Sequence, residues 1–342
     1  MKIAAIAFTK NGAELAIRLS DKLQGCTPYA PLPYSGQGVH SINGTLNEWT
    51  GRAFETHDGI VFIGACGIAV RAIAPFVKNK LKDPAIVVVD EKSKYAISLL
   101  SGHVGGANAL ALLVADAIGA DPVITTATDC NNIFSVDEWA VRSGMNIANP
   151  ERIKDISGAL LAGKQIGLKT SFEVVGKLPA GVVDSESAEN GICISLGTEE
   201  NPYEKTLVLI PMILHLGIGC RKGVCETQIK DAVSAVLSQN DISPAAIKDI
   251  SSIDLKENEP GLRAFCKTWH KPFYVYKASL LAEIKEQVSA SEFVKEITGV
   301  DNVCERAALF SAGKDASLLI PKSAIGQVTV ALAAEFWRVE FE

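Results

Sequence analysis

Short apolar segments alternate with segments of helical spacing along the first third of the chain. The apolar runs cover residues 2–8, 59–63, 85–90, 95–100 and 122–127. Between the first two runs, residues 13–23 place apolar side chains at intervals of three and four, which predicts a helix. Strands that alternate with helices predict a doubly wound, mostly parallel α/β sheet in this part of the chain.

The pattern changes in the middle of the chain and then returns to alternating strands and helices. Helices are predicted over residues 136–145 and 150–162, followed by short strands over 165–169 and 191–196, typical of a small α+β segment. A strand at 213–216 and a helix at 224–237 open a C-terminal α/β domain. Its further predicted strands are 247–253, 272–276, 317–320 and 328–333, and its further helices are 260–269, 280–288 and 292–297.

A chain of 342 residues is too long to fold around one ordinary hydrophobic core. We therefore predict an N-terminal α/β domain over residues 1–137, a middle linker subdomain over 138–208 and a C-terminal α/β domain over 209–342.

A glycine-rich turn joins the strand predicted over residues 95–100 to the helix that follows it. Residues 101–106 read S-G-H-V-G-G, so His103 lies between a strand end and a helix start. Backbone N–H groups at a helix N-terminus favour anions, and open α/β sheets bind ligands where strands end. A tight turn without a ligand, in which the glycines only allow positive φ angles, explains the same residues equally well.

Two further glycine turns carry cations. Residues 64–75 lead from a strand into a helix, with Arg71 in the first turns of that helix. A ligand carboxylate or simple surface exposure accounts for Arg71 equally well. Because both N-terminal turns follow strands, we expect them at one edge of the sheet. The third turn, 217–223, carries Arg221 and Lys222; its glycines do not match a dinucleotide fingerprint, and it favours carboxylate or phosphate binding.

Two residues of the C-terminal part have competing interpretations. Asn302 and Glu305 have the spacing of a helix-capping box, which is weighed equally against an acid–base role for Glu305. His215 lies in an apolar strand and is predicted to be a core histidine with its polar atoms satisfied.

Composition restricts the class of protein. The net charge of −6 gives no overall basic footprint for nucleic acid. No apolar run is long enough to span a bilayer, and the first run is too short for a signal peptide, so we expect a cytoplasmic protein that binds neither membrane nor nucleic acid. The eight cysteines form no C-x-x-C pair, so we expect no metal site.

Several long motifs, in order along the chain, resemble one known family. Residues 67–75 and 100–108 are similar to the N-terminal signature of the CbiG family of cobalamin-biosynthesis proteins. Residues 217–223, 252–256 and 299–308 resemble its C-terminal domain. The resemblance implies a hydrolase of the anaerobic vitamin B12 pathway. Such enzymes open the δ-lactone of cobalt-precorrin-5A and release acetaldehyde to give cobalt-precorrin-5B.

This chemistry suggests roles for the residues of the motifs. Lactone opening needs a base for water and donors for an oxyanion. His103 is the preferred base and Glu305 the second acid–base, and Ser101 is placed with them as catalytic. The backbone amides of residues 102–106 are candidate oxyanion donors. The residues expected to bind substrate, among them cations suited to acetate and propionate groups, are Arg71, Gly102, Gly105, Gly106, Asn108, Cys220, Arg221, Lys222 and Arg306.

The same turns would serve other functions. A non-catalytic carrier that binds a corrinoid intermediate is the main alternative, and a nucleotide-dependent enzyme is a weaker one. The resemblance implies a corrinoid substrate that brings its own cobalt, with no protein-bound cofactor. Other enzymes of the pathway and a second copy of the chain are candidate protein partners. Packing is favoured over covalent catalysis for Cys220 and Cys304.

Overall fold

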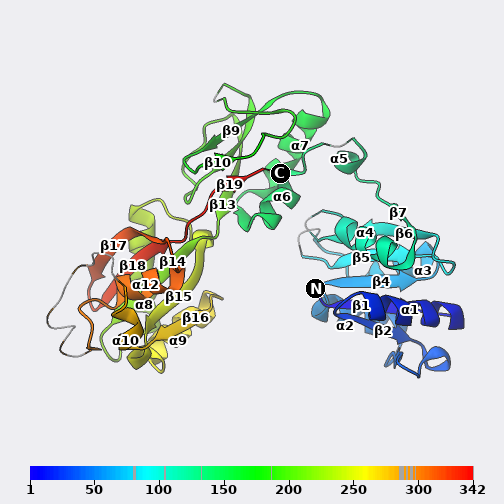
Figure 1. Cartoon of the computed structure of the whole chain (residues 1–342), viewed down its shortest axis with the longest axis horizontal. Coiled ribbons are helices and arrows are strands. Elements are labelled where there is room, and N and C mark those ends of the chain that lie inside the picture. Colours follow the sequence, from blue (N-terminus) through cyan, green and yellow to red (C-terminus); the bar gives the residue numbers. More distant parts are fainter. Residues whose placement is uncertain are drawn as a thin grey trace. The chain divides into compact units, whose positions relative to one another are not determined.

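The computed structural model divides the chain into two compact units, Met1–Glu138 and Trp139–Glu342, each described by itself (Figure 1). It describes residues 1–79, 82–103, 105–131, 133–185, 187–284 and 298–341, together with 289, 292 and 296. The boundaries of the three predicted domains stay a prediction.

The N-terminal unit is built on a sheet with the strand order β3-β2-β1-β4-β5-β6-β7. Its strands are β1 (Ile3–Ala7), β2 (Cys26–Ala30), β3 (His40–Ser41), β4 (Gly59–Ile63), β5 (Ala85–Val89), β6 (Tyr95–Leu100) and β7 (Asp121–Val123). Its helices are α1 (Lys10–Lys22), α2 (Leu46–Thr56), α3 (Cys66–Ile73), α4 (Ala107–Ile118) and α5 (Ala127–Cys130), and α6 (Val136–Arg142) crosses the boundary between the units.

Helices cover both faces of this sheet (Figure 1). Leu19 of α1 and Leu110 of α4 share one buried cluster with Val87 of the sheet. On the opposite face, Trp49 of α2 and Ala72 of α3 lie in a second cluster. Strand β4 is buried throughout, as expected for a strand covered on both faces. The predicted doubly wound, mostly parallel sheet is therefore confirmed.

One strand of this sheet runs against the others. Strand β6 is antiparallel to β5, with Leu100 opposite Ile86, whereas β4 and β5 are parallel. The turn after β6 therefore lies at the end of the sheet where β4 begins, and the turn at Gly64 lies at the other end. A strand of five residues is about 16 Å long at roughly 3.3 Å per residue. The expectation that the two N-terminal glycine turns share an edge is wrong.

The short strand β7 pairs with β6 in parallel, with Ile97 opposite Val123. The carboxyl ends of these two strands are therefore neighbours. The turn containing His103 follows one strand, and the segment leading to α5 follows the other. This is where the polar side chains described below come together.

The second unit contains two larger sheets. The middle sheet has the order β11-β9-β12-β13-β8, in which only the β13–β8 pairing is antiparallel. Its strands are β8 (Met145–Ile147), β9 (Ile166–Thr170), β11 (Val182–Val183), β12 (Asn190–Ile194) and β13 (Lys205–Pro211), and helix α7 (Ile153–Leu161) packs on it. A separate short pairing joins β10 (Val174–Val175) to β19 (Val339–Glu340) near the end of the chain.

The C-terminal sheet has the order β16-β15-β14-β18-β17. Its strands are β14 (Leu214–Cys220), β15 (Ile247–Ile253), β16 (Phe273–Tyr276), β17 (Ser317–Ile325) and β18 (Val328–Ala334). Its helices are α8 (Glu226–Gln239), α9 (Pro260–Thr268), α10 (Ala278–Leu281) and α12 (Cys304–Ala312). The helices predicted over 280–288 and 292–297 lie largely outside the described residues.

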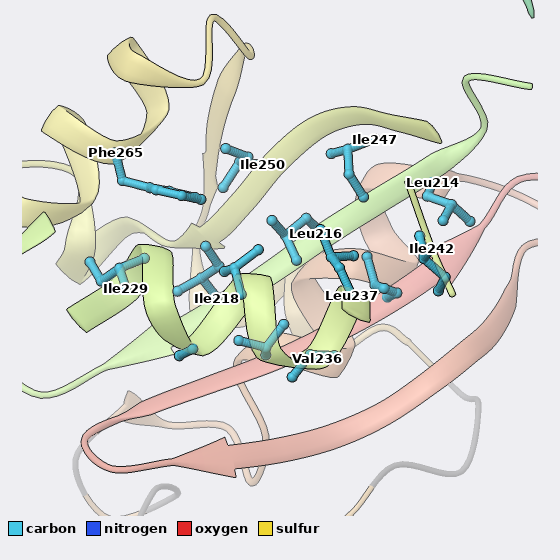
Figure 2. Close-up of a cluster of buried hydrophobic side chains, with 14 of the residues drawn as sticks. Leu214, Leu216, Ile218, Ile229, Val236, Leu237, Ile242, Ile247, Ile250 and Phe265 are labelled. Atoms are coloured by element: carbon cyan, nitrogen blue, oxygen red, sulfur yellow. The ribbon is translucent and has the colours of Figure 1, made fainter. Parts of the chain in front are cut away.

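The core of the C-terminal sheet lies between its strands and helices α8 and α9. Figure 2 shows Ile229 and Val236 of α8 and Phe265 of α9 in one cluster with Leu216 and Ile250 of the sheet, and all of these side chains are buried. Burying an aliphatic or aromatic side chain of this size contributes about 1.5–3 kcal/mol of transfer free energy. This cluster therefore holds the strand that carries the motif at residues 217–223.

That motif is only partly a turn. Strand β14 continues to Cys220, so Gly217 and Gly219 belong to the strand and only residues 221–223 form the turn. A Cβ atom added at Gly217 would lie 1.8 Å from the carbonyl oxygen of Cys304, at the start of α12. Glycine is needed here because the helix approaches the strand too closely for any side chain.

Among the described residues, none of the helices has the length and apolar character that crossing a membrane would require.

Candidate active site

His103 lies in a polar cluster at the carboxyl ends of β6 and β7. Its Nε2 atom is 3.0 Å from Oδ2 of Asp129 and 2.7 Å from Oγ1 of Thr128. Both side chains come from the short helix α5, which follows β7. An ionised carboxylate can only accept hydrogen bonds, so the proton on Nε2 of His103 is donated toward Asp129.

Asp129 is held in place from three directions. Its Oδ2 atom accepts hydrogen bonds from His103, from Nδ2 of Asn108 at 3.1 Å and from the Thr126 hydroxyl. Asn108 is buried, donates also to Thr126 and accepts a hydrogen bond of 2.7 Å from Ser98. This geometry gives Asn108 a supporting role beneath the cluster rather than the substrate contact that was expected.

The second nitrogen of His103 remains available for chemistry. Within the part of the chain that the structure describes, Nδ1 has no hydrogen-bond partner, and the side chain is 21% exposed. With the proton on Nε2, the neutral imidazole carries its lone pair on Nδ1. His103 is thus arranged to accept a proton from a molecule that reaches the turn.

The turn itself contains both occupied and unoccupied backbone donors. The amides of Gly106, Ala107 and Asn108 donate to the carbonyls of His103, Ser101 and Gly102, respectively. The sequence suggested the Gly106 amide as an oxyanion donor, but this amide is already engaged by the carbonyl of His103. In the described chain, the amides of Gly102, His103 and Gly105 have no such partner. These three N–H groups are the candidate oxyanion donors of the turn.

Ser101 has an unusual conformation at the start of the turn. Its φ angle is +61°, and its buried hydroxyl has no hydrogen-bond partner among the described residues. A Cβ atom added at Gly105 would lie 2.2 Å from Cβ of Ser101, so only glycine fits against it. A strained residue with an unsatisfied polar group is typical of a functional site.

Arg71 lies away from this cluster. It is exposed in the last turn of α3, rather than in the first turns as expected, and its Nη1 donates to the carbonyl of Gly67 at 3.2 Å. A cation in the last turn of a helix is favoured by the helix dipole, so a bound carboxylate is not needed to explain it. Helix α3 starts at the end of the sheet opposite His103.

The C-terminal cationic turn already binds a carboxylate of the same chain. Arg221 and Lys222 are exposed, but the Gly223 amide donates to Oε1 of Glu259 at 2.8 Å, and Lys256 Nζ is 3.0 Å from Oε2. Burial raises the pKa of Glu259, but the hydrogen bonds from Gly223 and Lys256 and the nearby lysine charges outweigh it and lower the pKa overall. A carboxylate of the protein thus engages the Gly223 amide, while the side chains of Arg221 and Lys222 stay exposed, and their expected role in anion binding stays a prediction.

Glu305 is fully buried, and its carboxylate accepts four hydrogen bonds. Oε2 accepts from the Ser289 amide at 2.7 Å and from Nδ2 of Asn302 at 2.9 Å. Oε1 accepts from the Ser289 hydroxyl at 2.9 Å and from the Lys322 amide at 2.6 Å, while the Glu305 amide donates to Oδ1 of Asn302. A carboxylate has about four acceptor positions, and all are used. The geometry favours a structural role for Glu305 over an acid–base role.

Arg306 is also engaged within the protein. Its Nε donates to Oδ1 of Asp301 at 2.7 Å, and its Nη1 donates to the carbonyls of Leu281 and Ile284. The guanidinium therefore joins α12 to the last residue of α10 and to the segment that follows it. The fork geometry expected to bind a substrate carboxylate is directed at protein groups instead.

The two motif cysteines are poorly suited to nucleophilic catalysis. Burial raises the pKa of the Cys304 thiol to about 11, and burial also raises the pKa of Cys220. A thiol with a raised pKa carries little thiolate at neutral pH. Packing is the role that their surroundings support.

His215 is a core histidine, as predicted. It is buried, its Nδ1 is 2.9 Å from Oδ2 of Asp249, and its Nε2 is 3.4 Å from Oε2 of Glu335. No group of three or more histidine, cysteine or acidic side chains suited to a metal ion is found within the described residues.

The sequence-based reasoning missed Thr126, Thr128 and Asp129. Thr126 lies within the apolar run at 122–127, and Thr128 and Asp129 follow it directly without belonging to any motif. The available signal was their position after the strand that follows the His103 turn, because parallel neighbouring strands bring their carboxyl ends together.

Family models for three regions of one protein match the chain in order. They are "Cobalamin synthesis G N-terminal" over residues 48–129, "Cobalamin biosynthesis central region" over 134–211 and "Cobalamin synthesis G C-terminus" over 214–333. The first match contains both His103 and Asp129.

Curated proteins resemble the chain over nearly its whole length. The cobalt-precorrin-5A hydrolase of Salmonella typhimurium is 34% identical over 91% of this chain and 92% of that protein. The cobalt-precorrin-5A hydrolase of Priestia megaterium is 30% identical, over 96% of this chain and 94% of that protein. A crystal structure of a cobalamin biosynthesis protein G homologue from Sulfolobus solfataricus is 24% identical, covers 98% of this chain and 97% of its own, and gives a TM-score of 0.41.

Proposed function

This chain belongs to the CbiG family of cobalamin-biosynthesis proteins, and we propose that it acts as a cobalt-precorrin-5A hydrolase with His103 as its general base. The reaction is supported by the sequence identity of 34% and 30% to two proteins named cobalt-precorrin-5A hydrolase, which extends over most of each chain. The observation that supports the residue is the fixed imidazole, with Nε2 engaged by Asp129 and Nδ1 available.

Lactone opening is the first step. Nδ1 of His103 takes a proton from water as the water oxygen attacks the lactone carbonyl. Negative charge then develops on the carbonyl oxygen, and the amides of Gly102, His103 and Gly105 are the donors that can stabilise it. Collapse of the tetrahedral intermediate breaks the ring C–O bond. The imidazolium returns its proton to the departing alkoxide, which gives a free hydroxyl and a carboxylic acid, and the acid then releases its proton to solvent and becomes a carboxylate.

Acetaldehyde release is the second step and needs a base again. The freed hydroxyl loses its proton to His103, its C–O bond becomes the carbonyl of acetaldehyde, and the bond to the macrocycle breaks. The electron pair of that bond passes into the conjugated macrocycle, which accepts it. Because His103 has returned its first proton, the same nitrogen can serve both steps.

Substrate binding is assigned to exposed cations and to the turn. Each of Arg221, Lys222 and Arg71 is exposed and, taken by itself, is suited to pair with an acetate or propionate group of a corrinoid. Glu305, Arg306 and Asn108 support the surrounding structure. Cobalt enters with the substrate, so the proposal includes no resident cofactor, and other pathway enzymes or a second copy of the chain are the proposed protein partners.

A cytoplasmic location is part of the same proposal. All eight cysteines are described and all are free thiols, as is usual in a reducing compartment.

Acetaldehyde release from cobalt-precorrin-5A tests the proposal directly. We expect the purified protein to form one acetaldehyde per substrate consumed, and His103→Gln to lower kcat by about 10² to 10⁴-fold, the usual contribution of a general base. His40→Gln is the matched control, because His40 is an exposed histidine in the same unit. Circular dichroism and the melting temperature establish that both variants are folded.

Two outcomes would contradict the proposal. Full activity of His103→Gln would remove His103 from the mechanism. Binding of the substrate by the wild-type protein without acetaldehyde would identify a corrinoid carrier instead of a hydrolase.

A further inference from the structure

We propose that Asp129 is the positioning residue of the reaction, and that it fixes the His103 imidazole and stabilises the imidazolium formed in each proton transfer. This inference rests on the proposed function. It adds a residue that belongs to no glycine motif of the sequence and lies on a different element from His103.

The geometry separates the two nitrogens of His103 by task. Nε2 has two protein partners, Asp129 at 3.0 Å and Thr128 at 2.7 Å, and Nδ1 has no hydrogen-bond partner among the described residues. A carboxylate on one nitrogen sets the tautomer and the ring orientation, so the other nitrogen points where a base is needed. The Thr128 hydroxyl can also accept the hydrogen bond from Nε2–H, but it carries no charge. Of these two partners, only Asp129 can therefore stabilise the positive charge of the imidazolium.

The carboxylate is itself immobilised. One oxygen of Asp129 accepts hydrogen bonds from Asn108, Thr126 and His103, and the buried Asn108 is in turn fixed by Ser98. Three donors from three different residues converge on this one oxygen. They hold the negative charge at a constant distance from the imidazole, which is the arrangement required for stabilising a transient cation.

Charge balance during the reaction gives the carboxylate of Asp129 an electrostatic role. When Nδ1 takes a proton from water or from the freed hydroxyl, His103 becomes positive and the reacting oxygen becomes negative. Asp129 offsets the positive charge without taking the proton itself. Its side chain is 33% exposed, so it keeps part of its hydration between turnovers.

Asp129→Asn and Asp129→Ala test this role. Asparagine keeps the shape and can place its carbonyl oxygen toward the same donors, but it removes the charge. We expect kcat for acetaldehyde release to fall by about 10² to 10⁴-fold in both variants, with KM changed less than threefold. Asp116→Ala is the matched control, because Asp116 is an exposed carboxylate on α4 outside the cluster, and its kcat should stay within twofold of wild type.

Chemical rescue distinguishes positioning from simple support of the fold. Asp129→Ala leaves a partly exposed space beside Nε2, into which formate can bring a carboxylate. We expect sodium formate to raise kcat of Asp129→Ala at least tenfold over sodium chloride at equal ionic strength, and to leave wild type and His103→Gln unchanged. The low-field proton resonance of Nε2–H should move upfield in Asp129→Asn and remain in Asp116→Ala.

The outcomes separate this inference from the proposed function. If His103→Gln is inactive but both Asp129 variants keep wild-type kcat, the positioning role is overturned and the base remains. If His103→Gln is active, the assignment of His103 as the base is wrong, and the role of Asp129 is overturned with it. If Asp129→Ala is inactive, folded by circular dichroism and unresponsive to formate, while Asp129→Asn is fully active, Asp129 serves only the fold.

Discussion

The glycine-bearing motifs of the two units look alike in sequence but differ in what they leave available. In the N-terminal unit, the His103 turn has a free imidazole nitrogen, three unengaged amides and the unpartnered Ser101 hydroxyl among the described residues. In the C-terminal unit, Glu259 occupies the Gly223 amide, and the Glu305 carboxylate accepts four hydrogen bonds. Polar residues in a motif become candidates for catalysis only when the fold does not satisfy them itself.

The difference has a physical cause in how each segment is packed. Helix α12 approaches β14 so closely at Gly217 that its polar residues are enclosed and must find partners inside the protein. The His103 turn joins the end of a strand to a helix start, where part of the polar surface stays exposed. Polar residues that are enclosed, as in α12, therefore form structural networks. Polar residues that stay partly exposed, as in the His103 turn, remain available to act on a ligand.

The largest expected effect on stability comes from Glu305→Gln. An amide cannot accept all four hydrogen bonds, so at least one buried donor loses its partner. We expect the free energy of unfolding to fall by roughly 2–4 kcal/mol, since hydrogen bonds to charged groups contribute about 1.5–3 kcal/mol each. Urea unfolding followed by circular dichroism measures the change, and kcat at a temperature below the transition should stay near that of wild type.

Glu283→Gln is the matched control, because Glu283 is an exposed acidic residue just after α10. It should leave stability unchanged. The opposite pattern for Glu305→Gln, with normal stability and lost acetaldehyde release, would return Glu305 to the reaction and remove the contrast between the two motifs.

A smaller and pH-dependent effect is expected for Glu259→Gln, because two hydrogen bonds reach Glu259 against four at Glu305. The hydrogen bonds from Gly223 and Lys256 lower the pKa of Glu259 against the effect of burial. A carboxyl with a lowered folded-state pKa stabilises the fold above its unfolded value of about 4.3, and this contribution is lost as the pH falls through the folded value. Wild type should therefore melt above the variant at pH 7, and the difference should shrink below about pH 4.

An equal difference at pH 7 and pH 3.5 would show that the Glu259 charge does not stabilise this turn.

Much of the fold was predictable because its signals are local. The apolar runs at 59–63 and 95–100 became β4 and β6 with the same bounds. Strand direction was not predictable in the same way: β6 follows β5 through a short turn and pairs antiparallel to it. A hairpin connection of this kind reverses the end of the sheet at which the next turn appears, and this placed the Arg71 helix and His103 apart.

The candidate site was predictable only in part. His103 stands out because an imidazole between glycines is chemically conspicuous, but Asp129 is one acidic residue among 39 acidic residues. Its importance comes from the parallel β6–β7 pairing, a long-range contact that the order of the strands suggests but that no motif encodes. The saturation of Glu305 by Ser289 and Lys322 was hidden for the same reason.

The smallest expected effect concerns the backbone of the turn at Ser101. A non-glycine residue at φ +61° is strained, and glycine adopts this conformation without a steric penalty. Ser101→Gly should therefore raise the free energy of unfolding by roughly 0.5–1 kcal/mol relative to Ser101→Ala, which removes the hydroxyl but keeps the strain. Both variants lack the hydroxyl, so the difference between their free energies of unfolding in urea measures the backbone strain at residue 101.

Activity of the same pair separates the hydroxyl from the strain. If the strained backbone holds the unengaged amides in position, Ser101→Ala should keep most of the wild-type kcat, and Ser101→Gly should lose several-fold while gaining stability. Equal loss in both variants would assign the effect to the hydroxyl and make Ser101 a catalytic group in its own right. Wild-type kcat in both would show that the open turn acts through His103 alone.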